Sequence, residues 1–212
     1  MDLSDLRKQY TKGELLEKEA PQNPFDLFGH WFDEVQKAGI ESEANALTLC
    51  TIDLMGSPKS RVVLLKEVRE DGFVFFTNYN SEKGQSIAKH NKVCLSFFWP
   101  SVERQIIIQG IAQKLSDKNS DQYFSSRPRG SQLGAHVSHQ SREIDDRSSL
   151  EDRLAQLEVE YKDKPIPRPS HWGGFVVSPV FFEFWQGRPN RLHDRLVYHQ
   201  TGVKWSINRL SP

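Results

Sequence analysis

Three arginines, a histidine and a tryptophan gather in one short C-terminal segment, Phe181–Arg195. Its first part alternates as a strand does, and a glycine and a proline then interrupt the alternation. If the residues after this break are extended, Arg191, His193 and Arg195 point the same way. Two permanent cations beside an imidazole suit an anionic, electron-rich ligand. The alternative is a surface strand whose charges are simply solvated.

Further cations stand at the ends of expected strands. Arg61 and Lys66 bracket four aliphatic residues, and their spacing places them on opposite faces of a strand. Either one is solvated while the other lies at the rim of a pocket, or both line a pocket at an interface. Gln105 precedes three isoleucines, and a polar amide in a buried strand needs a hydrogen-bond partner.

A third group of polar residues lies in the segment Tyr-Phe-Ser-Ser-Arg-Pro-Arg-Gly-Ser-Gln. On a turn-like backbone Tyr123, Arg127 and Ser131 would bring two hydroxyls and a guanidinium around one phosphate, a dianion that these donors suit. The alternative is a basic, flexible loop, and the residues alone do not decide between the two.

Taken together, these segments resemble the pyridoxine/pyridoxamine 5′-phosphate oxidase family, whose members are FMN enzymes. The resemblance covers nearly the whole chain and is strongest in Glu-x-Trp-Gln followed by Arg-Leu-His-Asp-Arg. It implies an FMN-binding split β-barrel, mainly antiparallel β with flanking helices (α+β), and a homodimer with its flavin sites at the interface. We expect a flexible N-terminal arm over residues 1–22 and a single domain over residues 23–212.

The resemblance also implies an activity, the oxidation of pyridoxamine 5′-phosphate and pyridoxine 5′-phosphate to pyridoxal 5′-phosphate. Hydride would pass from the C4′ carbon of the substrate to flavin N5, and O2 would then reoxidise the flavin and give H2O2. The amine substrate would release ammonia. The place of such an enzyme is vitamin B6 biosynthesis and salvage.

The resemblance assigns site residues in two sets. Substrate contacts are expected from Lys66, Tyr123, Arg127, Ser131, Arg191, Leu192 and His193, with Arg191 and His193 as the catalytic pair. FMN contacts are expected from Arg61, Val62, Val63, Leu64, Leu65, Lys66, Phe76, Thr77, Lys83, Gln105, Gln140, Ser141, Trp185 and Arg195.

Two segments match the family less well. The family commonly has Ser-Arg-Lys where this chain has Ser81-Glu82-Lys83, and a glutamate cannot donate to a phosphate. Glu82 is therefore not assigned to the site, and we expect it to weaken FMN binding. The N-terminal Arg7-Lys8-Gln9-Tyr10 only loosely matches a segment that the family uses to cover the substrate.

Composition excludes several other classes. The 212 residues carry 28 Lys and Arg against 28 Asp and Glu, and this balance disfavours a nucleic-acid or membrane-surface binder. Cys50 and Cys94 lie in apolar runs, which predicts buried, reduced thiols, and the polar N-terminus has no signal core. A cytoplasmic protein without a metal site is expected. The rivals are a split-barrel flavin or haem carrier or sensor and a nucleic-acid-binding barrel.

The pattern of apolar residues predicts the elements that position these groups. A helix starts at Asn23-Pro24 and ends at Gly39, and a second starts at Ser81. Ser148 is expected to open a helix through a capping box with Glu151. The stretch from 126 to 148 is expected to be a long polar loop. Strands are expected over residues 46–52, 60–68, 72–77, 93–99, 104–113, 172–177, 181–186 and 204–210, and a further helix over 116–125.

Overall fold

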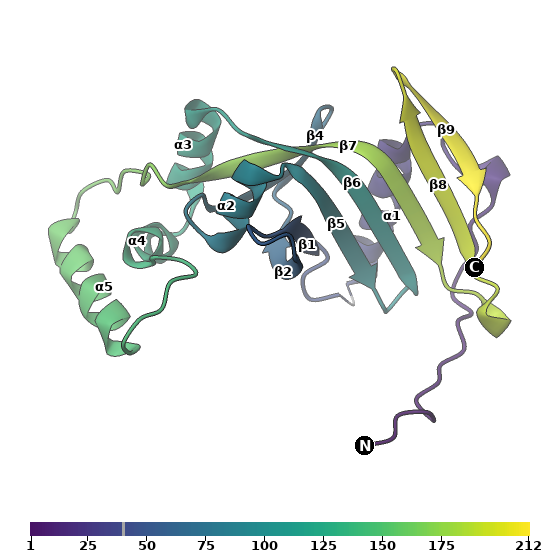
Figure 1. Ribbon diagram of the computed structural model, residues 1–212, viewed down its shortest axis with the longest axis horizontal. Helices are drawn as coiled ribbons and strands as arrows, with labels where there is room; N and C mark the ends of the chain where they lie inside the picture. The colour runs from purple at the N-terminus through teal and green to yellow at the C-terminus, as the bar shows by residue number, and fades with distance from the viewer. Residues whose placement is uncertain (40) are drawn as a thin grey trace. The chain divides into compact units, whose positions relative to one another are not determined.

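The computed structural model describes residues 1–39 and 41–212. Along the chain the elements are η1 (Glu17–Glu19), α1 (Pro24–Ala38), β1 (Ala46–Ile52), β2 (Pro58–Leu64), β3 (Glu67–Arg69), β4 (Gly72–Asn78), α2 (Glu82–Lys89), β5 (Lys92–Trp99), β6 (Arg104–Lys114), α3 (Asp117–Ser126), α4 (Arg129–Val137), α5 (Ser148–Glu160), β7 (Trp172–Gln186), η2 (Pro189–Arg191), β8 (Asp194–Thr201) and β9 (Lys204–Arg209) (Figure 1).

The strands form a mainly antiparallel sheet, as predicted. Their hydrogen-bonded order is β2-β1-β5-β6-β7-β4-β3, and β7 also pairs with β8, which pairs with β9. The described chain divides into two compact units. Unit 1 comprises Met1–Cys50, Cys94–Gly110 and Pro179–Pro212, and unit 2 comprises Thr51–Val93 and Ile111–Ser178. The single domain expected over 23–212 stays a prediction.

Unit 1 is built around helix α1, which begins as predicted. The side chain of Asn23 accepts a hydrogen bond from the backbone N–H of Phe25, and Gly39 ends the helix in the left-handed region at φ 62°. The buried face of α1 meets strand aromatics: the ring centres of Phe28 and Phe97 are 5.3 Å apart, and those of Trp31 and Phe184 are also 5.3 Å apart. These contacts fix the second half of β7 and the loop that follows it.

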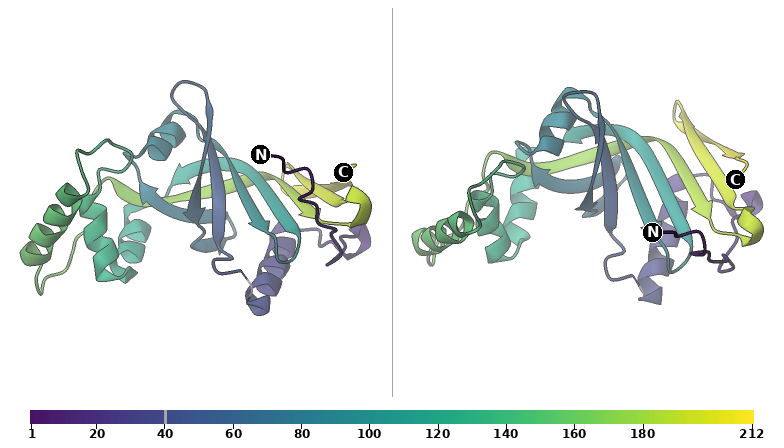
Figure 2. Two further views of the ribbon diagram at one scale, coloured as in Figure 1. Left: turned by 90° about the horizontal axis from the view of Figure 1, so that it is seen from below. Right: turned by 60° about the horizontal axis from the view of Figure 1, so that its bottom comes forward.

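Unit 2 is built around the pairing of β4 with the first half of β7, in which Phe75 lies opposite Phe175. Helices α3, α4 and α5 lie together in both views of Figure 2. They enclose a cluster of buried apolar side chains, namely Phe124, Leu133, Leu157, Ile166 and Trp172. This cluster holds α3 and α4 in place, and the two helices carry the residues from 123 to 131.

Several boundary predictions were wrong. The expected loop from 126 to 148 contains helix α4, which forms because Leu133 is buried in the unit 2 cluster. The helix at Ser148 has no capping box: Asp146 accepts from the backbone N–H of Ser149 instead. The expected strand over 60–68 is divided into β2 and β3, and the two strands expected over 172–186 are one strand, β7.

The N-terminal arm, which belongs to unit 1, contacts the rest of that unit at several points. Leu15 is 5% exposed, and its backbone N–H donates to Asp194. Arg209 pairs with Glu17. The flexibility expected of residues 1–22 stays a prediction.

Candidate functional site

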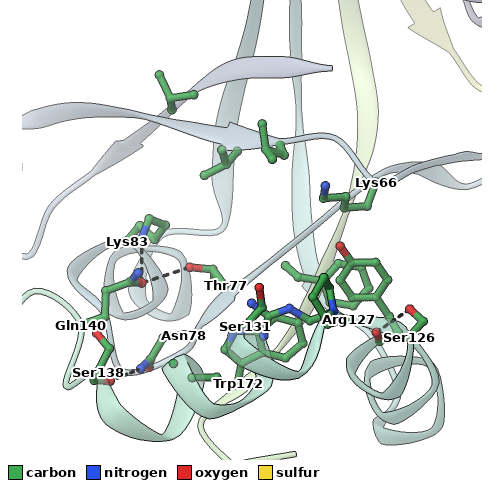
Figure 3. Close-up of a pocket in the computed structure, with 18 residues that line it drawn as sticks. Lys66, Thr77, Asn78, Lys83, Ser126, Arg127, Ser131, Ser138, Gln140 and Trp172 are labelled. Carbon is green, nitrogen blue, oxygen red and sulfur yellow. Dashed lines mark hydrogen bonds between the residues drawn. The ribbon is translucent and has the colours of Figure 1, made fainter. Parts of the chain in front are cut away.

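A cavity of about 650 Å³ lies within unit 2 (Figure 3). That volume is in the range of small-molecule and cofactor sites. Strands β2 and β4 and helices α2, α3 and α4 supply most of its wall. The predicted site residues that line it are Val62, Val63, Leu64, Lys66, Phe76, Thr77, Lys83, Tyr123, Arg127, Ser131 and Gln140.

One wall of the cavity is a layer of parallel aromatic rings. Tyr123 stacks on Phe76 at 3.8 Å between ring centres, and Phe76 lies 5.5 Å from Trp172. The guanidinium carbon of Arg127 lies 4.4 Å from the centre of the Trp172 ring, within the range of a cation–π contact. Burial lowers the pKa of Arg127 and raises that of Tyr123. The wall therefore combines flat apolar surface with two buried donors.

Arg127 presents an unpaired donor to the cavity. Its Nη1 atom is buried and has no hydrogen-bond partner among the described residues. Buried donors are nearly always paired, so an unpaired guanidinium nitrogen indicates a ligand acceptor. Ser131 lies one turn along the chain in α4, where it faces the same cavity. Tyr123 in α3, Arg127 in the link between α3 and α4, and Ser131 in α4 thus line one cavity, although not from a single turn.

The cations of the cavity lie at two ends. Figure 3 shows Lys66 and Arg127 on one side and Lys83 on the other. Nζ of Lys83 donates to Oε1 of Gln140 at 3.0 Å, and the same oxygen accepts from Thr77 at 3.4 Å. Burial is the larger cause, and nearby Arg61 the smaller, of a lowered pKa of Lys83. Two separated positive ends suit two anionic groups.

A smaller pocket of about 430 Å³ shares Lys83 with the main cavity. Arg61 and Ser141, both predicted site residues, line it with Lys59 and Glu82. Glu82 forms an ion pair with Lys59, and Arg61 donates to Oγ1 of Thr51 at 2.6 Å. Three cations around one carboxylate leave this pocket net positive.

The C-terminal candidates line a separate cleft of about 700 Å³ in unit 1. Trp185, Arg191 and His193 lie there with residues 6–10, Arg188 and Asn190. The backbone N–H of Arg188 donates to Nδ1 of His193 at 3.1 Å, which assigns the ring proton to Nε2. Burial and then the neighbouring Arg191 lower the pKa of His193. The imidazole is therefore a neutral donor beside a permanent cation.

The loop that carries Arg191 is not the extended strand on which the sequence argument depended. Residues 189–191 form η2, and both Asn190, at φ 57°, and Arg191, at φ 62°, are left-handed. Strand β8 begins only at Asp194. Arg191 and His193 still line one cleft, whereas Arg195 pairs with Glu183 at 2.7 Å.

Four predicted contacts line none of these three pockets: Leu65, Gln105, Leu192 and Arg195. Leu65 is buried, and Leu192 is 68% exposed. Nε2 of Gln105 donates to Ser96 at 3.4 Å. The assignment of these residues to a ligand stays a prediction.

Some cavity residues were missed from the sequence. Trp172 was recognised only as a strand residue, although it supports Arg127. Gly134, Ala135 and Ser138 also line the cavity, and they follow the predicted Ser131 at helical spacing. This spacing of small residues predicts a helix and shows which of its faces is turned to the cavity.

Comparison with known proteins places the chain in a family. Residues 32–161 match the family described as pyridoxamine 5′-phosphate oxidase. The chain belongs to this family. Residues 172–212 match the pyridoxine 5′-phosphate oxidase C-terminal dimerisation region. The resemblance seen in the sequence is therefore confirmed.

Relatives align over nearly the full length. The chain is 59% identical over 211 residues to a pyridoxine/pyridoxamine 5′-phosphate oxidase of Flavobacterium johnsoniae, covering 99% of both chains. It is 53% identical to the enzyme of that name from Christiangramia forsetii, covering 100% of this chain and 99% of the relative.

Solved structures give the same fold. PhzG from Burkholderia lata, in complex with tetrahydrophenazine-1-carboxylic acid, matches with a TM-score of 0.88 at 28% identity, covering 95% of this chain and 100% of that one. A pyridoxamine 5′-phosphate oxidase-related, FMN binding protein from Nostoc punctiforme matches with a TM-score of 0.71 at 16% identity, covering 91% and 100%. The split β-barrel prediction is confirmed. Among the described residues, no helix has the length and apolarity that crossing a membrane would require.

Proposed function

We propose that this chain is an FMN-dependent oxidase that converts pyridoxamine 5′-phosphate and pyridoxine 5′-phosphate to pyridoxal 5′-phosphate, with O2 as the acceptor. The observation that carries the proposal is the buried, unpaired Nη1 of Arg127 in a cavity that also presents Tyr123 and Ser131. The names of the near-full-length relatives support the same substrate class.

The residues present fit FMN. The phosphate of the cofactor would meet the positive end of the cavity, where Lys83, Arg61 and Ser141 lie, and Gln140 and Thr77 offer further polar groups. FMN bound here would supply a two-electron acceptor, at N5, for hydride from the substrate C4′ carbon, with O2 as the final acceptor and H2O2 as the product; with the amine substrate, water would then hydrolyse the imine and release ammonia. The chain itself supplies binding, orientation and charge.

The substrate phosphate would bind at the other end. Arg127 and Lys66 supply charge, and the hydroxyls of Tyr123 and Ser131 donate to the remaining oxygens. Because the Trp172 ring already holds the guanidinium of Arg127, little side-chain freedom is lost on binding. This end fixes the substrate but does not touch the carbon that reacts.

Arg191 and His193 would act on the pyridine ring. The neutral imidazole of His193 has its proton on Nε2, so it can donate a hydrogen bond to an electron-rich ring substituent. Arg191 places a permanent charge beside the same group. The pair would orient the substrate so that its C4′ carbon meets the cofactor.

The two sets of residues lie in different units, and we propose that a homodimer unites them. In this arrangement the unit 2 cavity of one copy faces the unit 1 cleft of its partner, so each flavin site draws on two chains. The match of residues 172–212 to a dimerisation region supports a dimer. Val62, which lines the unit 2 cavity, is 68% exposed in the single chain, as expected for a residue that a partner covers.

The experiment that tests this function starts from the purified protein. Its visible spectrum should be that of a flavin, and mass spectrometry of the released chromophore should give FMN, about one per chain. Addition of pyridoxine 5′-phosphate under air should yield pyridoxal 5′-phosphate and H2O2. FAD, or no flavin after reconstitution, would overturn the proposal. Bound FMN without turnover of either substrate would instead favour a flavin carrier.

A further inference from the structure

The carboxylate of Glu103 is buried, and its hydrogen-bond partners come from the N-terminal arm. Glu103 precedes β6 and is 1% exposed. Its Oε2 accepts from the backbone N–H of Thr11 at 2.7 Å and of Lys12 at 3.0 Å, and Oε1 lies 3.5 Å from Nζ of Lys8. A buried carboxylate without partners is strongly unfavourable, so release of the arm would carry a large penalty.

The backbone of Glu103 is hydrogen-bonded to the end of β7. Its carbonyl accepts from the N–H of Gly187 at 2.8 Å and from Nε2 of Gln186 at 3.3 Å. Glu103 itself is left-handed, at φ 59°, a conformation that is uncommon and unfavourable for a glutamate and that its surroundings must stabilise. One residue thus connects the arm to the end of β7.

The arm held in this way forms a wall of the unit 1 cleft. The ring of Tyr10 lies edge-on to Trp185 at 5.7 Å and at 5.6 Å from His193. A Cβ on Gly187 would lie 2.8 Å from Cγ of Tyr10, so the arm is in tight contact with the backbone there. In both views of Figure 2 the arm runs past the loop that follows β7. Arg7 and Lys8 line the cleft with Arg191.

We propose that Glu103 is a positioning residue: it fastens residues 8–12 so that Tyr10 stays against Trp185 and His193 and the arm closes the substrate side of the cleft. This inference rests on the proposed function for the identity of the substrate. Glu103 touches no ligand. It acts through the arm, which adds the positive charge of Arg7 to a cleft that would receive a phosphorylated ring, while the charge of Lys8 is offset by Glu103.

The first test measures the arm directly and needs no turnover. Trypsin cleavage after Arg7 and Lys8 and amide hydrogen exchange at Thr11 and Lys12 are followed in the full chain and in Glu103→Gln. We expect both rates to rise by about tenfold or more, because the amide replaces a charged acceptor. Unchanged cleavage and exchange in a folded Glu103→Gln chain would overturn the proposal.

A matched control distinguishes an effect on the arm from a general effect on the turn that carries Glu103. Glu41 accepts from the backbone N–H of Ser101 at 2.9 Å in that turn, and among the described residues its side chain forms no hydrogen bond or ion pair with the arm. Glu41→Gln should leave arm cleavage at the rate of the unmodified chain, and an equal increase in both variants would contradict a role of Glu103 through the arm. If Glu103→Gln does not fold, Thr11→Pro removes one donor from the other side of the bond, and slow cleavage in that chain overturns the proposal.

The second test uses steady-state kinetics with pyridoxine 5′-phosphate. Glu103→Gln should raise KM by about tenfold with a smaller change in kcat, and FMN affinity should stay the same. In a full-length Tyr10→Ala chain, the same substitution should have little further effect on KM. A persistent effect there would show that Glu103 acts on the barrel alone. If the unmodified chain shows no activity with pyridoxine 5′-phosphate, the proposed function is wrong. The cleavage assay would still decide the role of Glu103, because it needs no turnover.

Discussion

The guanidinium carbon of Arg127 lies over the ring of Trp172, 4.4 Å from its centre, while the Nη1 atom of Arg127 is buried without a partner among the described residues. The Trp172 ring fixes the orientation of the guanidinium, and burial excludes the water that would otherwise accept a hydrogen bond from Nη1. A phosphate that enters the cavity therefore meets a donor that is already oriented. Water would be a poorer partner for it than a dianion.

Arg127→Ala should therefore mainly raise KM for pyridoxine 5′-phosphate, by roughly 10- to 100-fold, the range for loss of a hydrogen bond to a charged group. The reason is that the substrate phosphate is bound equally in the ground and transition states. Arg129→Ala is the matched control, since Arg129 donates to the backbone of Tyr161 and Lys164 and does not line the cavity. A fall in kcat with unchanged KM would contradict this assignment.

Arg191→Ala should lower kcat as well as substrate affinity, while FMN stays bound. Arg191 is assigned to the reacting ring, and a small misplacement of the reacting carbon costs about tenfold or more in rate. His193→Asn should act in the same direction more mildly, because an amide keeps one hydrogen bond but carries no charge. Steady-state kinetics with pyridoxine 5′-phosphate, together with the flavin content of each variant, tests both assignments. A full kcat in Arg191→Ala with bound FMN would remove Arg191 from the reacting centre.

Glu82→Arg should tighten FMN binding by roughly fivefold, the scale of a partly exposed ion pair. Glu82 now pairs with Lys59 beside Arg61 and Lys83, so its replacement removes a negative charge and frees a cation. Titration of apo-protein with FMN measures the effect, and riboflavin, which has no phosphate, is the control ligand. Weaker FMN binding would mean that the carboxylate serves to hold Lys59 in place.

At a substrate concentration well below KM, where both single variants are slow, a dimer of one Arg127→Ala chain and one Arg191→Ala chain should recover activity. If each site draws on two copies, this mixed dimer contains one site with both arginines, so the isolated mixed dimer should have about half of full activity. The mixed dimer is isolated through two different tags and assayed beside each parent variant. Activity no greater than that of the parents would place both arginines of a site on the same chain.

His193 should titrate below the ordinary histidine value of 6.5, first because it is buried and second because Arg191 is close. Its folded pKa is lowered, so the stability it contributes is present above 6.5 and is lost as the pH falls through the folded pKa. NMR titration of the ring carbons measures this pKa. Arg191→Ala should raise it. A pKa above 6.5 in the unmodified chain would contradict the neutral donor role.

The residues alone left two interpretations open for Tyr123, Arg127 and Ser131, a phosphate site or a flexible basic loop, and the family resemblance favoured the first. The structure brings all three to one cavity, and their contact with a phosphate stays a prediction. Helix α4 was missed because its residues are polar, and only burial of Leu133 in unit 2 makes it stable. The partner of Glu82, Lys59, lies 23 residues away in sequence, and no local pattern joins them. Pairings of that kind depend on strand register.

At the consecutive left-handed residues Asn190 and Arg191, the requirements of stability and of the proposed activity differ. Asparagine accepts that conformation readily, but an arginine there costs about 1 kcal/mol relative to glycine. A search for heat-resistant variants would therefore favour glycine at 191, and it would select against the cation that the cleft needs. The loop is best left unaltered in engineering, and thermal resistance should be sought in elements that carry no cleft residue, such as the β8–β9 hairpin.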